Sequence, residues 1–152
     1  MLPRILPSPK ALLTTEELAT ISEAVKEAES ATSGEIRIFI ESRCAYMNPS
    51  FRAQEIFMNL GMHQTVDRNA VLIYIAFKDH DFALIGDKAI YEVATKPFWE
   101  TTAKELAKRF YNKEYVSGIC DCVASIGSKL HSHFPTHGET KNELPDEIVF
   151  GK

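Results

Sequence analysis

An unbroken run of eight apolar residues, at positions 70–77, constrains the fold more than any other feature of this chain. The run is short for a helix and rich in Val, Ile, Tyr and Phe, so it predicts a strand that is buried on both faces. Turn-forming polar residues follow it, and a second apolar segment occupies residues 82–86. We therefore predict a β-hairpin that turns at Asp79 and His80 and forms the centre of the sheet.

Apolar residues recur at helical spacing in four other segments. Thr14 and Glu17 form a capping-box pattern before the first of them, and Asn48 followed by Pro49 is typical of a helix start. Residues 35–41 alternate apolar and polar side chains, which predicts a half-covered strand nearer an edge of the sheet. The predicted helices span residues 14–30, 49–60, 97–112 and 115–133, and residues 88–96 are predicted to continue the second hairpin strand.

The order of these elements, α-β-α-β-β-α-α, predicts an α/β fold in one domain. The interval between residues 40 and 70 holds one helix and two short connections, as a crossover between parallel strands requires. We predict a three-layer α/β/α sandwich, in which helices cover both faces of a small mixed sheet with a central β-hairpin. The predicted parts of the chain are an extended arm (residues 1–13), the domain (residues 14–135) and a polar tail (residues 136–152), whose apolar residues 148–150 can dock on the domain.

Charge and cysteine content exclude several classes of protein. A net charge of −4 and a pI near 5.7 lack the basic footprint of nucleic-acid-binding proteins, so we expect no nucleic-acid partner. The three cysteines, an odd number without framework spacing, indicate free thiols in a reducing compartment. No segment has the length of a signal-peptide core or of a transmembrane span. We therefore expect a cytoplasmic protein.

Several short motifs together resemble the TPM domain family, in particular its short, stand-alone bacterial members. They are residues 32–38 (TSGEIRI), residues 69–74 (NAVLIY), residues 82–87 (FALIGD), and a closing helix with Tyr115, Gly118, Gly127 and residues 133–135 (HFP). The resemblance covers residues 14–135 and implies an α/β/α sandwich. It also implies binding of divalent cations, calcium especially, and acid phosphatase activity, both of which are attributed to plant members. The chain departs from the family at Arg68, where members commonly have Asp.

Three carboxylates, Glu35, Asp67 and Asp87, are the predicted metal ligands. Calcium and magnesium require several oxygen ligands, commonly carboxylates from separate loops. A parallel strand pair places Glu35 and Asp67 toward one end of the sheet, and the returning hairpin strand brings Asp87 back toward that end. The predicted pairing puts Gly86 opposite Ile73. It leaves Asp87 about 17 Å along an extended strand from Asp67, so Asp67 has to fold back for both to bind one ion.

A rival metal site lies at the other end of the hairpin. Asp79 and Asp81 flank the predicted turn, and Glu41 ends the first strand. Carboxylates are also common at turns and strand ends that bind no ligand, so an ordinary structural role for all of these aspartates and glutamates stays open.

Cysteine and histidine spacing favours structural roles. Cys120 and Cys122 lie two residues apart on a predicted helix and point in different directions, which favours core or boundary thiols over a shared metal. His131 and His133, with His137 nearby, are better explained as cationic groups near the carbonyls of a helix end than as zinc or nickel ligands.

The remaining motifs give little support to catalysis. Phe98 and Trp99 begin a helix at core spacing, which favours burial over a binding groove. The chain has no P-loop, no Cys-x5-Arg motif and no dense His/Asp constellation of the two-metal kind.

The preferred hypothesis is therefore a non-enzymatic binding module with a weak calcium or magnesium site and an unidentified protein partner. The first alternative is a metal-dependent acid phosphatase acting on phosphomonoesters, in which a bound metal activates water and shields the phosphate. The second alternative is a protein-interaction domain that binds no metal.

Overall fold

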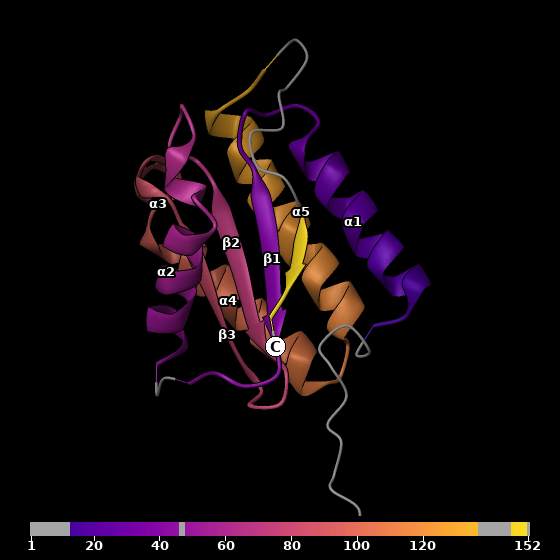
Figure 1. Ribbon diagram of the computed structural model, residues 1–152. Helices are drawn as coiled ribbons and strands as arrows, with labels where there is room; N and C mark the ends of the chain where they lie inside the picture. Colours follow the sequence, from indigo (N-terminus) through magenta and orange to yellow (C-terminus); the bar gives the residue numbers. More distant parts are fainter. Residues whose placement is uncertain (1–12, 46–47, 137–146, 152) are drawn as a thin grey trace, which may run out of the picture.

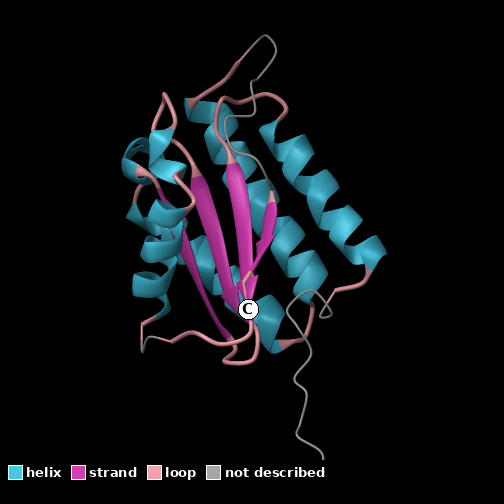
Figure 2. Ribbon diagram, in the orientation of Figure 1, coloured by secondary structure: helices cyan, strands magenta, loops and turns pink. Residues whose placement is uncertain are grey.

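Figure 1 and Figure 2 show a mixed β-sheet with helices on both of its faces. The computed structural model describes residues 13–45, 48–136 and 147–151. Within these residues, four strands form one sheet in the order β3-β2-β1-β4. The predicted α/β sandwich is confirmed, because a mixed sheet lies between helical layers.

The centre of the sheet is a parallel pair, β1 (Ile36–Glu41) and β2 (Val71–Ala76), as the predicted crossover requires. Every residue of both strands is buried, so the apolar run forms the two-sided strand that its composition predicts. The predicted position of β1 near an edge is wrong. Its polar residues Arg37 and Glu41 are buried because each forms ion pairs inside the fold, and the alternating pattern does not mark a solvent-facing side.

The strand β3 (Asp81–Gly86) returns antiparallel to β2, so the predicted hairpin is confirmed. Its loop consists of residues 77–80 rather than two residues, and the pairing shifts with it: Gly86 lies opposite Val71 instead of Ile73. A shift of two residues leaves every side chain on its predicted face, because side chains alternate with a period of two. β3 is an edge strand, so the hairpin does not form the centre of the sheet.

Part of the predicted tail adds a strand to the other edge of the sheet. β4 (Ile148–Phe150) lies parallel to β1, and the Gly151 N–H donates to the Ile40 carbonyl at 2.8 Å. This strand covers the outer edge of β1 and so places β1 inside the sheet. Residues 1–12 of the predicted arm and residues 137–146 of the predicted tail lie outside the described part of the chain.

The predicted helix starts are confirmed at both capping motifs. Thr14 forms the capping box with Glu17 at the start of α1 (Thr15–Glu29). The Asn48 side chain accepts the Ser50 N–H at the start of α2 (Pro49–Asn59). The other helices with predicted counterparts are α4 (Lys96–Tyr111) and α5 (Tyr115–His133), and a short 3-10 turn, η2 (Met62–Gln64), precedes β2.

A further helix, α3 (Lys88–Ala94), replaces the strand predicted for residues 88–96. The Asp87 carboxylate accepts the Lys88 N–H and acts as the N-cap of this helix. Aspartate in an extended conformation is a favoured N-cap, so the chain turns into a helix directly after β3.

The two faces of the sheet carry separate cores. One face, which includes Ile38 and Ile73, packs against α1, α3, α4 and α5. The opposite face, which includes Phe39 and Tyr74, is covered by α2 and η2. Figure 1 shows this separation, with α2 on one side of the sheet and α1 and α5 on the other.

Candidate functional site

The three predicted metal ligands lie near the end of the sheet where β1 and β2 begin. The Val71 N–H donates to the Glu35 carbonyl at 2.8 Å, and the Asp87 N–H donates to the Ala70 carbonyl at 2.8 Å. Glu35 and Asp87 therefore flank Ala70 on neighbouring strands. Asp87 lies opposite Ala70 and not Leu72, so only three residues, at most about 10 Å of chain, separate its position from Asp67 instead of the predicted 17 Å.

Asp87 is held by an arginine and by the helix that it caps. Arg68 Nε lies 2.7 Å from one Asp87 carboxylate oxygen, and Arg68 Nη2 lies 3.0 Å from the other. The Asp87 side chain is buried, while that of Arg68 is 47 % exposed. Hydrogen bonding to this carboxylate raises the pKa of the Arg68 guanidinium above its ordinary value. The Asp87 carboxylate thus accepts charge-assisted hydrogen bonds from Arg68 and a further hydrogen bond from the Lys88 N–H.

Glu35 belongs to a buried ionic cluster between β1 and α1. Arg37, which is 2 % exposed, lies 3.8 Å from Glu35 and 3.3 Å from Glu29, and donates to the Ile36 carbonyl at 2.8 Å. The Glu29 carboxylate also accepts the Ile36 N–H at 2.8 Å. Burial raises the pKa of Glu29 to about 7, and the Ile36 and Arg37 contacts oppose that shift. These contacts join the end of α1 to the buried start of β1 and hold Glu35 within the protein.

Asp67 contacts a different set of residues. The Ser33 hydroxyl donates to Asp67 Oδ2 at 2.5 Å, and the Asn69 amide nitrogen donates to the Ser33 oxygen at 3.0 Å. Because the Ser33 hydrogen is used on Asp67, only the NH2 group of Asn69 can face Ser33. Asn69 is fully buried, and its Oδ1 has no hydrogen-bond partner within the described residues. We refer to Ser33, Asp67 and Asn69 as the Asp67 cluster.

Backbone strain lies beside the same cluster. Arg68, between Asp67 and Asn69, adopts a left-handed conformation with a φ of 51°, which is costly for a residue with a Cβ. Strained residues and unsatisfied buried polar atoms concentrate at functional sites. The structure thus brings Asp67 together with Ser33 and Asn69, and it assigns Glu35 and Asp87 to separate ion pairs. No three His, Cys, Asp or Glu side chains in the described segments form a group that could hold a metal ion.

Two residues of this region have roles that the sequence pattern did not reveal. In the sequence, Arg68 stands out only as a departure from the family motif, and Asn69 only as part of that motif. Arg68 and Asp87 are 19 residues apart in sequence, so no local spacing predicts their contact. The conformation that aims Arg68 at Asp87 depends on the hairpin register.

A family model described as the TPM domain matches residues 8–129, which is more than half of the chain. The chain belongs to the TPM domain family.

Two solved structures resemble this TPM domain. The NMR structure of the BA42 protein from the psychrophilic bacterium Bizionia argentinensis is 36 % identical, with a TM-score of 0.83, and the match covers 91 % of this chain and 95 % of BA42. The N-terminal domain of the cg2496 protein from Corynebacterium glutamicum has a TM-score of 0.66 at 11 % identity, over 95 % of this chain and 94 % of that one, so it shows the fold alone. No curated protein matches the chain.

The rival acidic residues of this TPM domain lie at the opposite end of the sheet, and two of them, Glu41 and Asp79, are also held by protein groups. Glu41 is paired with Arg52 through two contacts of 2.9 Å and accepts a hydrogen bond from the Tyr74 hydroxyl. Asp79 accepts the Cys44 N–H at 2.6 Å. Asp81 begins β3. Burial and the Glu41 contact raise the pKa of the Tyr74 phenol well above its ordinary range, so Tyr74 stays protonated as the donor.

The remaining candidates occupy structural positions in the TPM domain. Cys120 is half-buried and Cys122 is buried, and burial raises the pKa of the Cys122 thiol to about 12. Trp99 is buried and stacks on Tyr91, with Phe98 edge-on at 5.1 Å between ring centroids. The aromatic residues at the start of α4 therefore belong to the core.

His131 and His133 lie in the last turn of α5 and are exposed, and His137 lies outside the described residues. Of the helices that the structure describes, none has both the length and the apolar character needed to cross a membrane.

Proposed function

We propose that this TPM domain is a non-enzymatic binding module with a weak site for calcium or magnesium at the Asp67 cluster. The observation that carries the proposal is the buried Asn69 Oδ1, an acceptor with no hydrogen-bond partner among the described residues. A buried acceptor of this kind requires a donor or a cation, since leaving it unsatisfied costs about 1–3 kcal/mol. Asp67 adds an exposed carboxylate to the cluster. It is linked to Asn69 through Ser33, which donates to Asp67 and accepts from Asn69.

The composition of the cluster agrees with weak binding. Magnesium and calcium are bound by carboxylate, amide and water oxygens, and magnesium commonly keeps several waters. Asp67 and Asn69 would supply one carboxylate and one amide oxygen, and water the remaining ligands. Glu35 and Asp87, the other two predicted ligands, would add little net negative charge, because their carboxylates are paired with Arg37 and Arg68.

The free thiols support a reducing, cytoplasmic location for this module. Cys44, Cys120 and Cys122 form no disulfide with one another.

A titration of the full chain with calcium and magnesium, followed by backbone NMR, tests the cation site. The amides of Ser33, Asp67 and Asn69 are expected to shift in a saturable way at millimolar ion, and Asp67→Asn is expected to abolish the shifts. Asp81→Asn is the matched control, because Asp81 lies at the opposite end of the sheet. If no amide near Asp67 shifts, the cation site is wrong, and the metal-free interaction domain becomes the better explanation.

The alternative of a metal-dependent phosphatase rests on the family to which the chain belongs, whose model carries the name TPM phosphatase. Arg68 also lies next to Asp67 and Asn69 in sequence, and its half-exposed guanidinium, which donates to Asp87 through Nε and Nη2, is of a type that commonly binds phosphate. A metal bound there would shield phosphate and activate water, with Asp67 and Asn69 as the residues that hold it.

A generic phosphomonoester assay of the wild-type chain in the presence of magnesium tests the phosphatase alternative. Asp67→Ala is expected to remove any hydrolysis, and Asp81→Asn is expected to leave it unchanged. Hydrolysis that survives both Asp67→Ala and Asp87→Ala would exclude these carboxylates from catalysis.

A further inference from the structure

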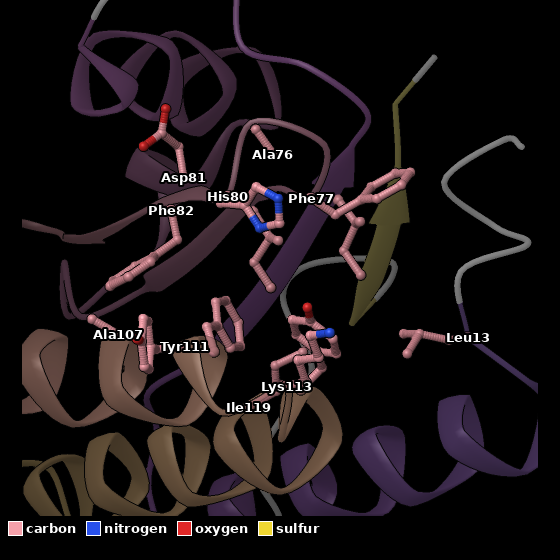
Figure 3. A pocket seen from close by; sticks show the side chains of 14 residues that line it. Leu13, Ala76, Phe77, His80, Asp81, Phe82, Ala107, Tyr111, Lys113 and Ile119 are labelled. Carbon is pink, nitrogen blue, oxygen red and sulfur yellow. The ribbon is translucent and has the colours of Figure 1, made fainter. Parts of the chain in front are cut away.

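A cavity of about 500 Å³ lies at the end of the sheet opposite the Asp67 cluster (Figure 3). Ile40 and Ile75, near the carboxyl ends of β1 and β2, form its floor. The hairpin loop borders it on one side, and the junction of α4 and α5 on the other. Ligands of α/β proteins favour the carboxyl ends of parallel strands, next to a strand whose connections run over opposite faces. β1 is such a strand, because α1 precedes it on one face of the sheet and α2 follows it on the other.

The cavity has a continuous aromatic wall. Phe82 packs edge-on against Phe110, with ring centroids 5.7 Å apart. The ring centroids of Phe110 and Tyr115 are 5.5 Å apart. Phe77 and Tyr111 complete the wall, and the Tyr111 ring is 88 % exposed at the rim. A volume of this size and an aromatic lining are typical of sites for small apolar molecules. The wall therefore suits a hydrocarbon or aromatic body.

Two basic residues, His80 and Lys113, line this cavity, and both have a left-handed backbone conformation. Lys113 has a φ of 61° and His80 a φ of 56°. Lys113 follows the C-cap of α4, at the position that glycine commonly fills because left-handed backbone is costly for other residues. Neither side chain forms a hydrogen bond or an ion pair with the part of the chain that the structure describes. The chain thus keeps two basic side chains at one cavity, at positions where their backbone conformation is unfavourable.

The acidic residue at this cavity is directed elsewhere. Phe82 packs with the core on the α4 and α5 face, so Asp81, its neighbour on β3, belongs to the opposite face. Figure 3 shows the Asp81 carboxylate pointing away from Tyr111 and Lys113, while His80 lies between Phe77 and Phe82. The charge presented at the cavity is therefore positive.

We propose that this cavity binds a small amphipathic carboxylate, with its apolar body against the aromatic wall and its carboxylate at Lys113 and His80. Lys113 provides a permanent positive charge and His80 provides one when protonated, and both donate to carboxylate oxygens. This site is independent of the proposed cation site, which lies at the other end of β1 and β2.

Titration of the full chain with decanoate, followed by NMR and by calorimetry, tests the proposal. Saturable binding with one decanoate per chain is expected, with shifts at Ile75, Phe82 and Phe110. Decyltrimethylammonium, which has the same chain and the opposite charge, is expected to bind at least about tenfold more weakly. Ala107→Trp is expected to block decanoate, because Ala107 lines the cavity from an exposed position on α4.

Lys113→Gly separates a binding role from a structural one. Glycine suits the left-handed backbone, so this variant is expected to melt at a higher temperature while its affinity for decanoate falls about tenfold. Lys88→Gln, which removes an exposed charge at the other end of the sheet, is the matched control and is expected to bind decanoate normally. Equal binding of decanoate and the cationic detergent, unchanged affinity in Lys113→Gly, or shifts outside the cavity would each overturn the proposal.

Discussion

The guanidinium of Arg68 contacts both carboxylate oxygens of Asp87, at distances of 2.7 and 3.0 Å. Arg68 precedes β2, and Asp87 follows β3 and begins α3. This pair therefore joins the two open ends of the hairpin and fixes the start of a helix. In this pair Arg68 binds the carboxylate of Asp87, which is one of the three predicted metal ligands.

Substitution of Asp87 is expected to separate helix capping from ion pairing. Asp87→Ala should lower the free energy of unfolding by about 2 kcal/mol, because it removes an N-cap worth about 1 kcal/mol and a partly exposed ion pair worth up to about 1 kcal/mol. Asp87→Asn retains a good N-cap and should cost less than about 1 kcal/mol. Urea unfolding followed by circular dichroism measures both. Equal losses for the two variants would show that the cap contributes nothing.

Removal of Arg68 is expected to strengthen cation binding. Arg68→Gln releases the Asp87 carboxylate, so calcium and magnesium affinity should rise about tenfold, which corresponds to about 1.4 kcal/mol. The measurement is the same NMR titration that tests the Asp67 cluster. Arg43→Gln is the control, since Arg43 is an exposed arginine paired with Asp79 at the other end of the sheet. An unchanged affinity in Arg68→Gln would mean that Asp87 lies outside the reach of the ion.

The ion pair between buried Glu41 and partly exposed Arg52 is expected to show strong coupling. Arg52→Met leaves the Glu41 carboxylate buried with Tyr74 as its remaining donor, and should cost about 3 kcal/mol. Adding Glu41→Gln removes the buried charge and keeps an acceptor for Tyr74, so the double variant should be more stable than Arg52→Met alone. Unfolding free energies of the four proteins form a double-mutant cycle. Additive losses would contradict the coupling.

Stability is expected to depend on the ionisation of Glu29. Burial raises the pKa of its carboxyl group from 4.5 to about 7, so the folded protein binds more protons than the unfolded chain between these values. The contribution of Glu29 is therefore fully present below pH 4.5 and is lost as the pH rises through about 7. We expect the loss to be about 3.5 kcal/mol, since the pKa rises from 4.5 to about 7 and one pKa unit corresponds to about 1.4 kcal/mol.

Glu29→Gln isolates this effect, because glutamine does not ionise. The difference in unfolding free energy between Glu29→Gln and the wild type should grow in favour of the variant from pH 4.5 to pH 7. Glu27→Gln serves as the control on the exposed side of α1 and should show no such trend. A difference that is independent of pH would mean that Glu29 ionises normally in the folded protein.

Local sequence patterns were sufficient to predict most of the helices and strands. The eight apolar residues at 70–77 identified β2, and the capping residues Thr14 and Asn48 marked the starts of α1 and α2. These patterns depend on residues that are close together in the sequence. They therefore predict the same element in any fold that buries its apolar face. The alternation of residues 35–41 was misleading, because Arg37 and Glu41 are buried by ion pairs with Glu29 and Arg52, which lie on other elements.

The candidate site was predicted less well than the fold. The sequence pointed to the correct end of the sheet for Glu35, Asp67 and Asp87. The hairpin loop is two residues longer than predicted, so Asp87 lies opposite Ala70 and not opposite Leu72. At that position the aspartate became a helix cap and the partner of Arg68. Loop length and long-range ion pairs have no periodic signature, so no pattern within one segment reports them.

The sequence by itself determined that this chain forms an α/β/α sandwich around a two-sided buried strand, because hydrophobic periodicity dictates which faces must be covered. Only the tertiary structure decided which carboxylates are free. Glu35, Glu41 and Asp87 are each held by an arginine, whereas Asp67 is joined through Ser33 to a buried amide. The physical reason is that an arginine pairs with a carboxylate only where the fold brings the two side chains together. That placement depends on strand register and on the positions of helices distant in sequence.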